Sequence, residues 1–259
     1  VEVDADRSAA ALEIGAIDVA GWDSEAEVSF VATPVGQIPQ MVVEALAAAP
    51  RGVVTDVGGV KAPVVEAVAA PRFVGGHPMA GSEQEGVEGA DPTMFVDSNW
   101  VLTPSADTDD GAFALIRSVV TSLGAEVITL APDRHDALVA LVSHVPHLTA
   151  SVLMGMADAR SEEHFAVLRL AAGGFRDMTR GAAGHPDNWP DICAENRGAI
   201  AEVLTDLINT LEAVRDEVVE TDRAGLLRRL EKARAARISL PIGAPRPSEL
   251  AEVRVPVLD

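Results

Sequence analysis

Short apolar runs alternate with helix-like segments through the first half of the chain, and this alternation restricts the possible folds more than any other feature. The runs are rich in valine, as buried strands are, and the segments between them carry apolar residues at helical spacing. Such an order predicts an α/β fold with a mainly parallel, doubly wound sheet. The expected strands are residues 1–5, 27–33, 53–57, 73–75, 100–103 and 126–130, and the expected helices are residues 8–14, 36–49, 61–69 and 111–123.

The second half lacks this alternation and is expected to be all helical. Residues 132–159 show helical periodicity and begin with a proline, which is favoured in the first turn of a helix. Residues 196–219 carry one long amphipathic stripe, and residues 222–237 form a further, basic helix. The chain therefore divides into a doubly wound domain over residues 1–128 and an all-α domain over residues 129–240.

Both ends of the chain are expected to be cut. A doubly wound, Rossmann-like dinucleotide domain opens with a strand, a G-x-G-x-x-G turn and a helix, and the sequence lacks that turn. The chain would then begin at the second strand, with Asp6 as the acid that binds the adenosine ribose. Residues 241–259 are expected to be a proline-rich linker and the start of another strand. The alternative is a complete chain with a smaller sheet.

Composition and charge exclude several classes of partner. The formal net charge is −20 and the only lysines are Lys61 and Lys232, so nucleic acid and anionic membrane surfaces are poor partners. The longest helix-like run, 136–157, is interrupted by polar residues and prolines, so no membrane span is expected, and no signal peptide is recognised. The lone Cys193 fits a reducing cytoplasm.

The stretch GGHPMAGSE, residues 75–83, places His77 after a strand-like run, at the edge where open α/β sheets bind ligands. Flanking glycines let the backbone approach closely, but the stretch holds no lysine or arginine, which argues against a phosphate loop. A histidine here can accept a proton from a substrate hydroxyl at neutral pH. The alternative is a hydrogen-bonded structural histidine.

The stretch SHVPH, residues 143–147, places His144 and His147 three residues apart on one helical face. This spacing permits a metal site, but no third ligand completes a recognisable pattern, so no metal is expected. The remaining interpretation is one histidine that contacts a substrate and one that lies in the core.

Two further stretches offer a cation and an aromatic ring. GGFRDMTR, residues 173–180, holds Arg176 and Arg180 one helical turn apart, which suits a carboxylate or, alternatively, a surface ion pair with Asp177. WPDICAEN, residues 189–196, places Trp189 before a helix, where it could cover a ligand, meet a neighbouring subunit or anchor helix packing.

Taken together, GGHPMAGSE, SHVPH, GGFRDMTR and WPDICAEN resemble the prephenate dehydrogenase family, including its arogenate-using members. The resemblance extends from DADR, residues 4–7, to about residue 240. It implies a Rossmann-like NAD(P)-binding domain, a helical domain that binds substrate and forms a homodimer, and a cytoplasmic enzyme of tyrosine biosynthesis. The implied reaction is the oxidative decarboxylation of prephenate to 4-hydroxyphenylpyruvate with NAD.

The resemblance also implies roles for residues that match the family motifs. His77 should take the proton of the ring hydroxyl, His147 should contact the substrate side chain, and Arg180 should bind a substrate carboxylate. Trp189 should reach the pocket from the partner subunit. The other implied pocket residues are His144, in a supporting role, Gly173, Asp177 and Glu83.

The implied cofactor is NAD, with NADP less favoured, because a carboxylate at Asp6 repels a 2′-phosphate. Besides Asp6, the residues matched to the cofactor site are Arg7, Thr33, Pro34, Asp56 and Gly59.

Two departures from the family pattern limit this interpretation. Many members carry serine in a D-x-G-S-V-K turn, whereas this chain reads DVGGVK with Gly59 at the serine position. The glycine-rich loop is also absent, and VRVPVLD at the end resembles the opening strand of an ACT domain. Three alternatives remain: an arogenate dehydrogenase, a sensing relative with impaired catalysis, and a β-hydroxyacid dehydrogenase. The last would need a catalytic lysine on the helical domain, and neither Lys61 nor Lys232 is placed to supply it.

Overall fold

The computed structural model describes residues 2, 4–81, 90–91, 93–161, 166–184 and 186–240. Glu83 and the expected linker and ACT-like strand at 241–259 lie outside the described residues.

Within the described residues, five strands form one sheet in the order β1-β2-β3-β4-β5. Pairing is parallel except between β3 and β4, so the expected mainly parallel sheet is confirmed. The strands are β1 (Val28–Val31), β2 (Val53–Asp56), β3 (Phe73–Pro78), β4 (Asn99–Thr103) and β5 (Glu126–Thr129). The helices between them are η1 (Val35–Gln37), α2 (Ile38–Ala48), α3 (Ala62–Val68) and α4 (Asp110–Ser122).

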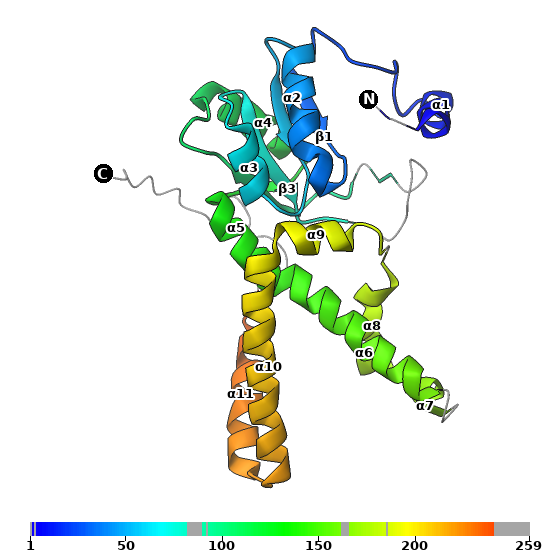
Figure 1. Cartoon of the computed structure of the whole chain (residues 1–259), viewed down its shortest axis with the longest axis vertical. Coiled ribbons are helices and arrows are strands. Elements are labelled where there is room, and N and C mark those ends of the chain that lie inside the picture. Colours follow the sequence, from blue (N-terminus) through cyan, green and yellow to red (C-terminus); the bar gives the residue numbers. More distant parts are fainter. Residues whose placement is uncertain are drawn as a thin grey trace.

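Helices cover both faces of the sheet. Val54 and Phe73 belong to a core that includes residues of α2 and α3, whereas the adjacent Val53 and Val74 belong to a second core with α4. Successive strand residues point to opposite faces, so a strand that is covered on both sides must be apolar throughout. This explains the continuous valine runs of the sequence and confirms the doubly wound arrangement (Figure 1).

The glycine pair of GGHPMAGSE is required by crowding between strands. A Cβ at Gly75 would lie 2.4 Å from Thr103 Oγ1, and one at Gly76 would lie 2.6 Å from the carbonyl oxygen of Asp56. Both distances are shorter than real Cβ contacts, so larger residues would push β2, β3 and β4 apart.

The expected strand over residues 1–5 is wrong at its described end. Helix α1 (Ala5–Glu13) already includes Ala5, and Asp4 caps it by accepting bonds from the backbone N–H groups of Asp6 and Arg7. Aspartate at this position satisfies donors that the first turn leaves unpaired, which favours helix over strand. Figure 1 shows α1 standing apart from the sheet at the end of an extended segment.

The second half is helical, as expected. Residues 132–161 form one continuous helix, in which α5 (Pro132–Val139) passes through a π-helical turn, η3 (Ala140–His144), into α6 (Val145–Ser161). The remaining elements are α7 (Ala166–Arg169), α8 (Gly173–Thr179), η4 (Arg180–Ala183), α9 (Trp189–Glu195), α10 (Arg197–Val219) and α11 (Arg223–Ile238).

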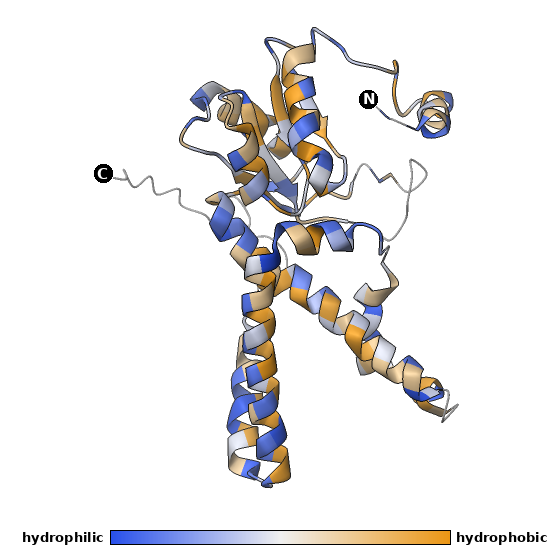
Figure 2. Cartoon of the chain, viewed as in Figure 1, coloured by the Kyte–Doolittle hydropathy of each residue, from blue (hydrophilic) through white to orange (hydrophobic). Residues whose placement is uncertain are grey.

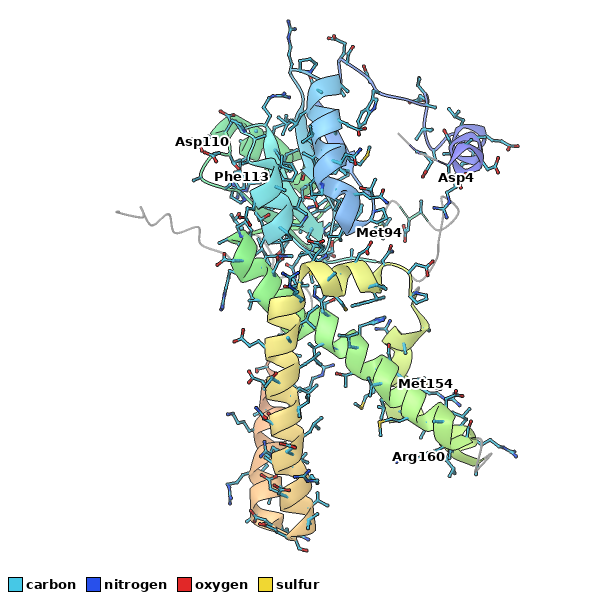
Figure 3. All side chains as sticks on the ribbon, viewed as in Figure 1. Asp4, Met94, Asp110, Phe113, Met154 and Arg160 are labelled. Carbon is cyan, nitrogen blue, oxygen red and sulfur yellow. The ribbon has the colours of Figure 1, made fainter. Side chains whose placement is uncertain are left out.

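The helical domain extends from the sheet as two diverging arms, one of α10 with α11 and one of α6 with α7 and α8 (Figure 1). Met154 and Arg160 lie on the part of α6 far from the sheet (Figure 3). Apolar residues, orange in Figure 2, recur along both arms, and several of them are exposed, including Val152 on α6 and Leu211 on α10. The two arms meet near the sheet in a small core that includes Ala140, Val145 and Ile200.

The continuous helix Pro132–Ser161 is long and apolar enough to cross a membrane by length and composition, contrary to the expectation from its polar interruptions. A helix whose apolar side packs against another protein surface passes the same test. Its first two turns hold the buried His135 and Asp136, which contact the sheet domain.

Candidate active site

His77 lies within β3, opposite Val101 of β4, and not beyond the strand end as the sequence suggested. The strand is longer than expected because antiparallel pairing with β4 continues from Gly75 to Pro78, past the last residue that pairs with β2. His77 therefore still projects from the carboxyl edge of the parallel part of the sheet, where ligands bind in such folds.

A buried chain of hydrogen bonds holds the His77 ring. His77 Nδ1 lies 2.8 Å from His135 Nε2, and His135 Nδ1 lies 2.7 Å from Asp136 Oδ1. His135 has no exposed surface and Asp136 has 5%. Among the described residues, the hydrogen-bond partners of these groups are one another and the backbone, so the protonation of the ring nitrogens follows from the carboxylate of Asp136.

The carboxylate of Asp136 can only accept, so His135 Nδ1 carries a proton, and in the neutral ring of His135 Nε2 is then an acceptor. His77 Nδ1 must then donate to His135, which leaves the lone pair of His77 on Nε2. Burial, together with His135, Lys61 and His144, lowers the pKa of His77 to about 3. The ring is therefore neutral at pH 7 and able to accept a proton at Nε2.

Asp136 also joins the two domains. Its Oδ1 accepts from the backbone N–H of Lys61 and its Oδ2 from that of Ala62, both at 2.8 Å, at the start of α3. One carboxylate on the helical domain thus caps a helix of the sheet domain and orients His135. The position of His77 depends on how the two domains pack.

Asp56, expected to bind the cofactor, is instead fully buried and paired with Lys61. Its carboxylate also accepts from the backbone N–H groups of Gly58 and Gly76, at 2.9 and 3.0 Å, while Lys61 Nζ donates to the carbonyl oxygen of Gly76 at 2.9 Å. Desolvation lowers the pKa of Lys61, which Asp56 opposes. This pair holds the β2–α3 turn against β3, and the fully buried Asp56 has no exposed surface that a ligand could contact.

His144 is buried in the π-helical turn and fits the core role that the sequence left open. Its Nδ1 lies 3.2 Å from Asn196 Nδ2, which also donates to the carbonyl oxygen of Asp136 at 2.9 Å. Burial lowers the pKa of His144 to about 4, with Asp136 opposing the shift, so this ring is neutral as well.

Gly59 lies between the two histidines. A Cβ at Gly59 would lie 3.7 Å from His77 Nε2 and 4.0 Å from His144 Nε2. The two ring atoms therefore border the same small space, and the missing side chain leaves that space open. The matched cofactor role of Gly59 remains a prediction.

His147 and Trp189 form the outer wall of the region. Their rings stack at 3.6 Å with 10° between the planes, and Trp189 also meets the edge of His144. Both residues belong to the same chain, and the implied role of Trp189 in the pocket of a partner subunit stays a prediction. Partial burial lowers the pKa of His147.

The arginine motif lies beside His147. A Cβ at Gly181, next to Arg180 in η4, would lie 3.7 Å from His147 Nδ1. Arg180 itself is exposed, as are Gly173 and Asp177 on α8. The structure therefore brings Arg180 to the His147 end of the region, and the implied pocket roles of the two α8 residues remain predictions.

The residues matched to the cofactor fall into two places. Thr33 and Pro34 follow β1 at the carboxyl edge of the sheet, and Thr33 Oγ1 is buried without a hydrogen-bond partner among the described residues. An unpaired hydroxyl at that edge fits a bound nucleotide cofactor. Asp6 and Arg7 lie on α1, away from the sheet, so the chain does not assemble them with Thr33 (Figure 1).

A cavity of about 520 Å³ opens beside His77, with an apolar wall that includes Phe30, Phe95 and Trp100. Such a wall suits a flat ring. Among the described residues, no group of three or more His, Cys, Asp or Glu side chains is arranged to hold a metal ion.

The sequence interpretation missed His135, Asp136 and Asn196. A signal was present, because His135 and Asp136 recur at helical spacing with Val139, Ala140 and His144, all of which are buried. Polar residues on the apolar face of a helix need buried partners. That pattern could have marked them as members of a network.

Family models match nearly the whole chain. Residues 1–129 match the nucleotide-binding domain of prephenate dehydrogenase, and residues 131–232 match its dimerization domain. The chain belongs to the prephenate dehydrogenase family. It is an NAD-dependent oxidoreductase with a Rossmann-like domain followed by a helical domain.

Individual relatives agree with this placement. Prephenate dehydrogenase of Bacillus subtilis is 32% identical over 258 residues, which are 93% of this chain and 68% of that protein. Cyclohexadienyl dehydrogenase of Zymomonas mobilis is 33% identical over 193 residues, 73% of this chain and 66% of that protein.

Two solved structures share the fold over most of both chains. Prephenate dehydrogenase from Aquifex aeolicus, in complex with hydroxyphenyl propionate and NAD+, has a TM-score of 0.86 and 26% identity, over 93% of this chain and 87% of that one. Synechocystis arogenate dehydrogenase has a TM-score of 0.75 and 29% identity, over 92% and 88%.

Proposed function

We propose that this chain carries the active site for the NAD-dependent oxidative decarboxylation of prephenate to 4-hydroxyphenylpyruvate, in the cytoplasm. The observation that carries the proposal is the neutral His77 ring, whose Nδ1 bonds to His135 and whose Nε2 has no hydrogen-bond partner among the described residues at the carboxyl edge of the sheet. The family membership supplies the substrate class.

His77 acts on the hydroxyl of the substrate ring. Its Nε2 accepts the hydroxyl proton, and the charge gained by the ring is stabilised through Nδ1 by His135 and Asp136. A histidine with the opposite proton placement would donate to the hydroxyl and could not take its proton. Hence the buried hydrogen bonds from Asp136 through His135 select the reactive protonation form of His77.

NAD would supply the acceptor for the hydride of the ring carbon that carries the hydroxyl. Thr33 and Pro34 would contact this cofactor at the edge of the sheet, because Thr33 Oγ1 is buried there without a partner among the described residues. We favour NAD over NADP because Asp6 matches the ribose-binding acid, which would repel a 2′-phosphate.

Arg180 binds a substrate carboxylate in this proposal. A guanidinium forms two parallel hydrogen bonds with a carboxylate, and η4 places Arg180 next to the His147–Trp189 stack. His147 would contact the substrate side chain at the same end. Because the chain carries a net charge of −20, an anionic substrate must be held by such local groups against the overall field.

Arogenate is the second candidate substrate. It differs from prephenate by an amino group in place of the keto group on the side chain, and the fold similarity to Synechocystis arogenate dehydrogenase is close. Cofactor reduction measured with prephenate and with arogenate in parallel distinguishes the two. A higher kcat/KM for arogenate would refute the assignment of prephenate.

We further propose a homodimer through the helical arms. A cavity of about 560 Å³ lies between α6, α8 and α10, and apolar side chains around it are exposed, including Met178 at 65%, Ile208 at 56% and Leu141 at 58%. The family model for this region describes a dimerization domain. Ile208→Asp should give a monomer by light scattering, whereas the exposed Glu202→Ala should leave a dimer.

The direct test of His77 is the His77→Asn variant. It should bind substrate but reduce kcat by about 10²–10⁴-fold, the usual contribution of a general base. Asp133→Asn, an exposed change in α5, is the matched control and should keep full activity. Turnover of His77→Asn within threefold of the unchanged protein would refute the role of His77.

A further inference from the structure

The second buried histidine of the site, His144, has its protonation fixed by Asn196. The backbone carbonyl of Asp136 can only accept, so the Asn196 atom that contacts it at 2.9 Å is the amide nitrogen. The same nitrogen lies 3.2 Å from His144 Nδ1 and offers it the second amide hydrogen. His144 Nδ1 is therefore an acceptor, and the neutral ring carries its proton on Nε2.

His77 has the opposite arrangement. The Asp136–His135 chain places the proton of His77 on Nδ1 and the lone pair on Nε2. Both Nε2 atoms border the space beside Gly59, at 3.7 Å for His77 and 4.0 Å for His144 from the position of a Cβ. One of the two facing atoms accepts a hydrogen bond and the other donates one.

A hydroxyl oxygen complements such a pair, because it donates one hydrogen bond and accepts others. Gly59 has no side chain to occupy the space beside the two rings. Two neutral histidines of opposite protonation, held by separate buried partners, select a hydroxyl over a carboxylate or an ammonium group.

We propose that His144 is a further catalytic residue, whose Nε2–H donates to the same ring oxygen from which His77 removes the proton. This role rests on the proposed reaction. As the hydride leaves carbon for the bound cofactor and the hydroxyl proton passes to His77, the oxygen becomes a carbonyl oxygen. The bond from the ring to the carboxylate then breaks, CO2 departs, and its electron pair moves through the ring to that oxygen, which becomes a phenolate.

The hydrogen bond from His144 stabilises the negative charge that gathers on the oxygen during loss of CO2, as donors in an oxyanion hole do. His77 then returns its proton to the phenolate, so no proton is gained or lost overall. His77 can take the hydroxyl proton, but its Nε2 can donate a hydrogen bond to the oxygen only after the His77 ring has become protonated. The two histidines therefore serve successive parts of the reaction.

The first test does not depend on the substrate. ¹⁵N NMR of the labelled protein at pH 7 should show His144 protonated on Nε2 and His77 protonated on Nδ1. In Asn196→Asp, a carboxylate replaces the donor, so the His144 proton should move to Nδ1. His144 protonated on Nδ1 in the unchanged protein would overturn the proposal.

The second test is kinetic. His144→Phe keeps a ring and removes the donor, and it should lower kcat about 10²-fold with the KM for prephenate changed less than threefold. Asn196→Asp should lower kcat similarly, although His144 is intact. Normal kcat in either folded variant would overturn the role of His144. Failure of the unchanged protein to oxidise prephenate or arogenate would instead refute the proposed function. The NMR measurement would still decide the protonation of His77 and His144, because it does not use substrate.

Discussion

Replacement of Asp136 by alanine tests the packing of the two domains and the active site together. The carboxylate accepts three hydrogen bonds, from the backbone N–H groups of Lys61 and Ala62 at 2.8 Å and from His135 Nδ1 at 2.7 Å. Alanine leaves all three donors without this partner. Lys61 and His135 have no exposed surface, so water cannot replace the lost acceptor there, whereas Ala62 is partly exposed.

The expected loss of stability follows from these environments. Each of the two buried donors should cost about 1.5–2 kcal/mol, and the partly exposed one about 1 kcal/mol. The sum is about 4–5 kcal/mol, which corresponds to a fall in Tm of about 10–15 °C for a chain of this size. Because His135 also loses its orientation, kcat should fall by at least tenfold in the protein that remains folded.

Thermal unfolding followed by circular dichroism measures the first effect, and cofactor reduction measures the second. The control is Asp133→Ala, an exposed aspartate in the first turn of the same helix, which should lower stability by less than about 1 kcal/mol. If Asp136→Ala and Asp133→Ala have the same Tm, the carboxylate does not join the domains and the argument is wrong.

Two further predictions concern the buried charges of the site. Lys61→Met should lower the free energy of unfolding in urea by about 3–5 kcal/mol, because it leaves Asp56 buried and unpaired. The control Lys232→Met, on the exposed side of α11, should change stability little, and equal effects of the two substitutions would contradict the burial of the Lys61–Asp56 pair. The folded-state pKa values of His77 and His144, about 3 and about 4, lie below the ordinary value of 6.5. As the pH falls below 6.5, the unfolded chain therefore binds more protons than the folded chain, and stability is lost. Between pH 8 and pH 5 each histidine should cost about 1–2 kcal/mol, and His77→Asn should remove its share of the slope; an unchanged slope in that variant would refute the assignment.

Much of the fold could be expected from the sequence because it depends on local patterns. Valine runs covered on both faces predict parallel strands, and the stripe over residues 196–219 predicts α10. The error near residue 5 has a local cause as well, since Asp4 caps α1 and accepts hydrogen bonds from the backbone N–H groups of its first turn. The motifs also identified His77, His144 and His147 as members of one site.

The sequence by itself determined most of the element order, the family and the histidines that we propose as catalytic and substrate-binding residues. Only the tertiary structure decided how those histidines are protonated, because this depends on contacts between residues far apart in the chain, such as His77 with His135 and Asn196 with His144. It also showed that Asp56, matched to the cofactor site, is buried in an ion pair with Lys61, because a buried charge is stable only when it is paired. Periodicity shows which side of a helix is buried, and only packing shows what that side meets.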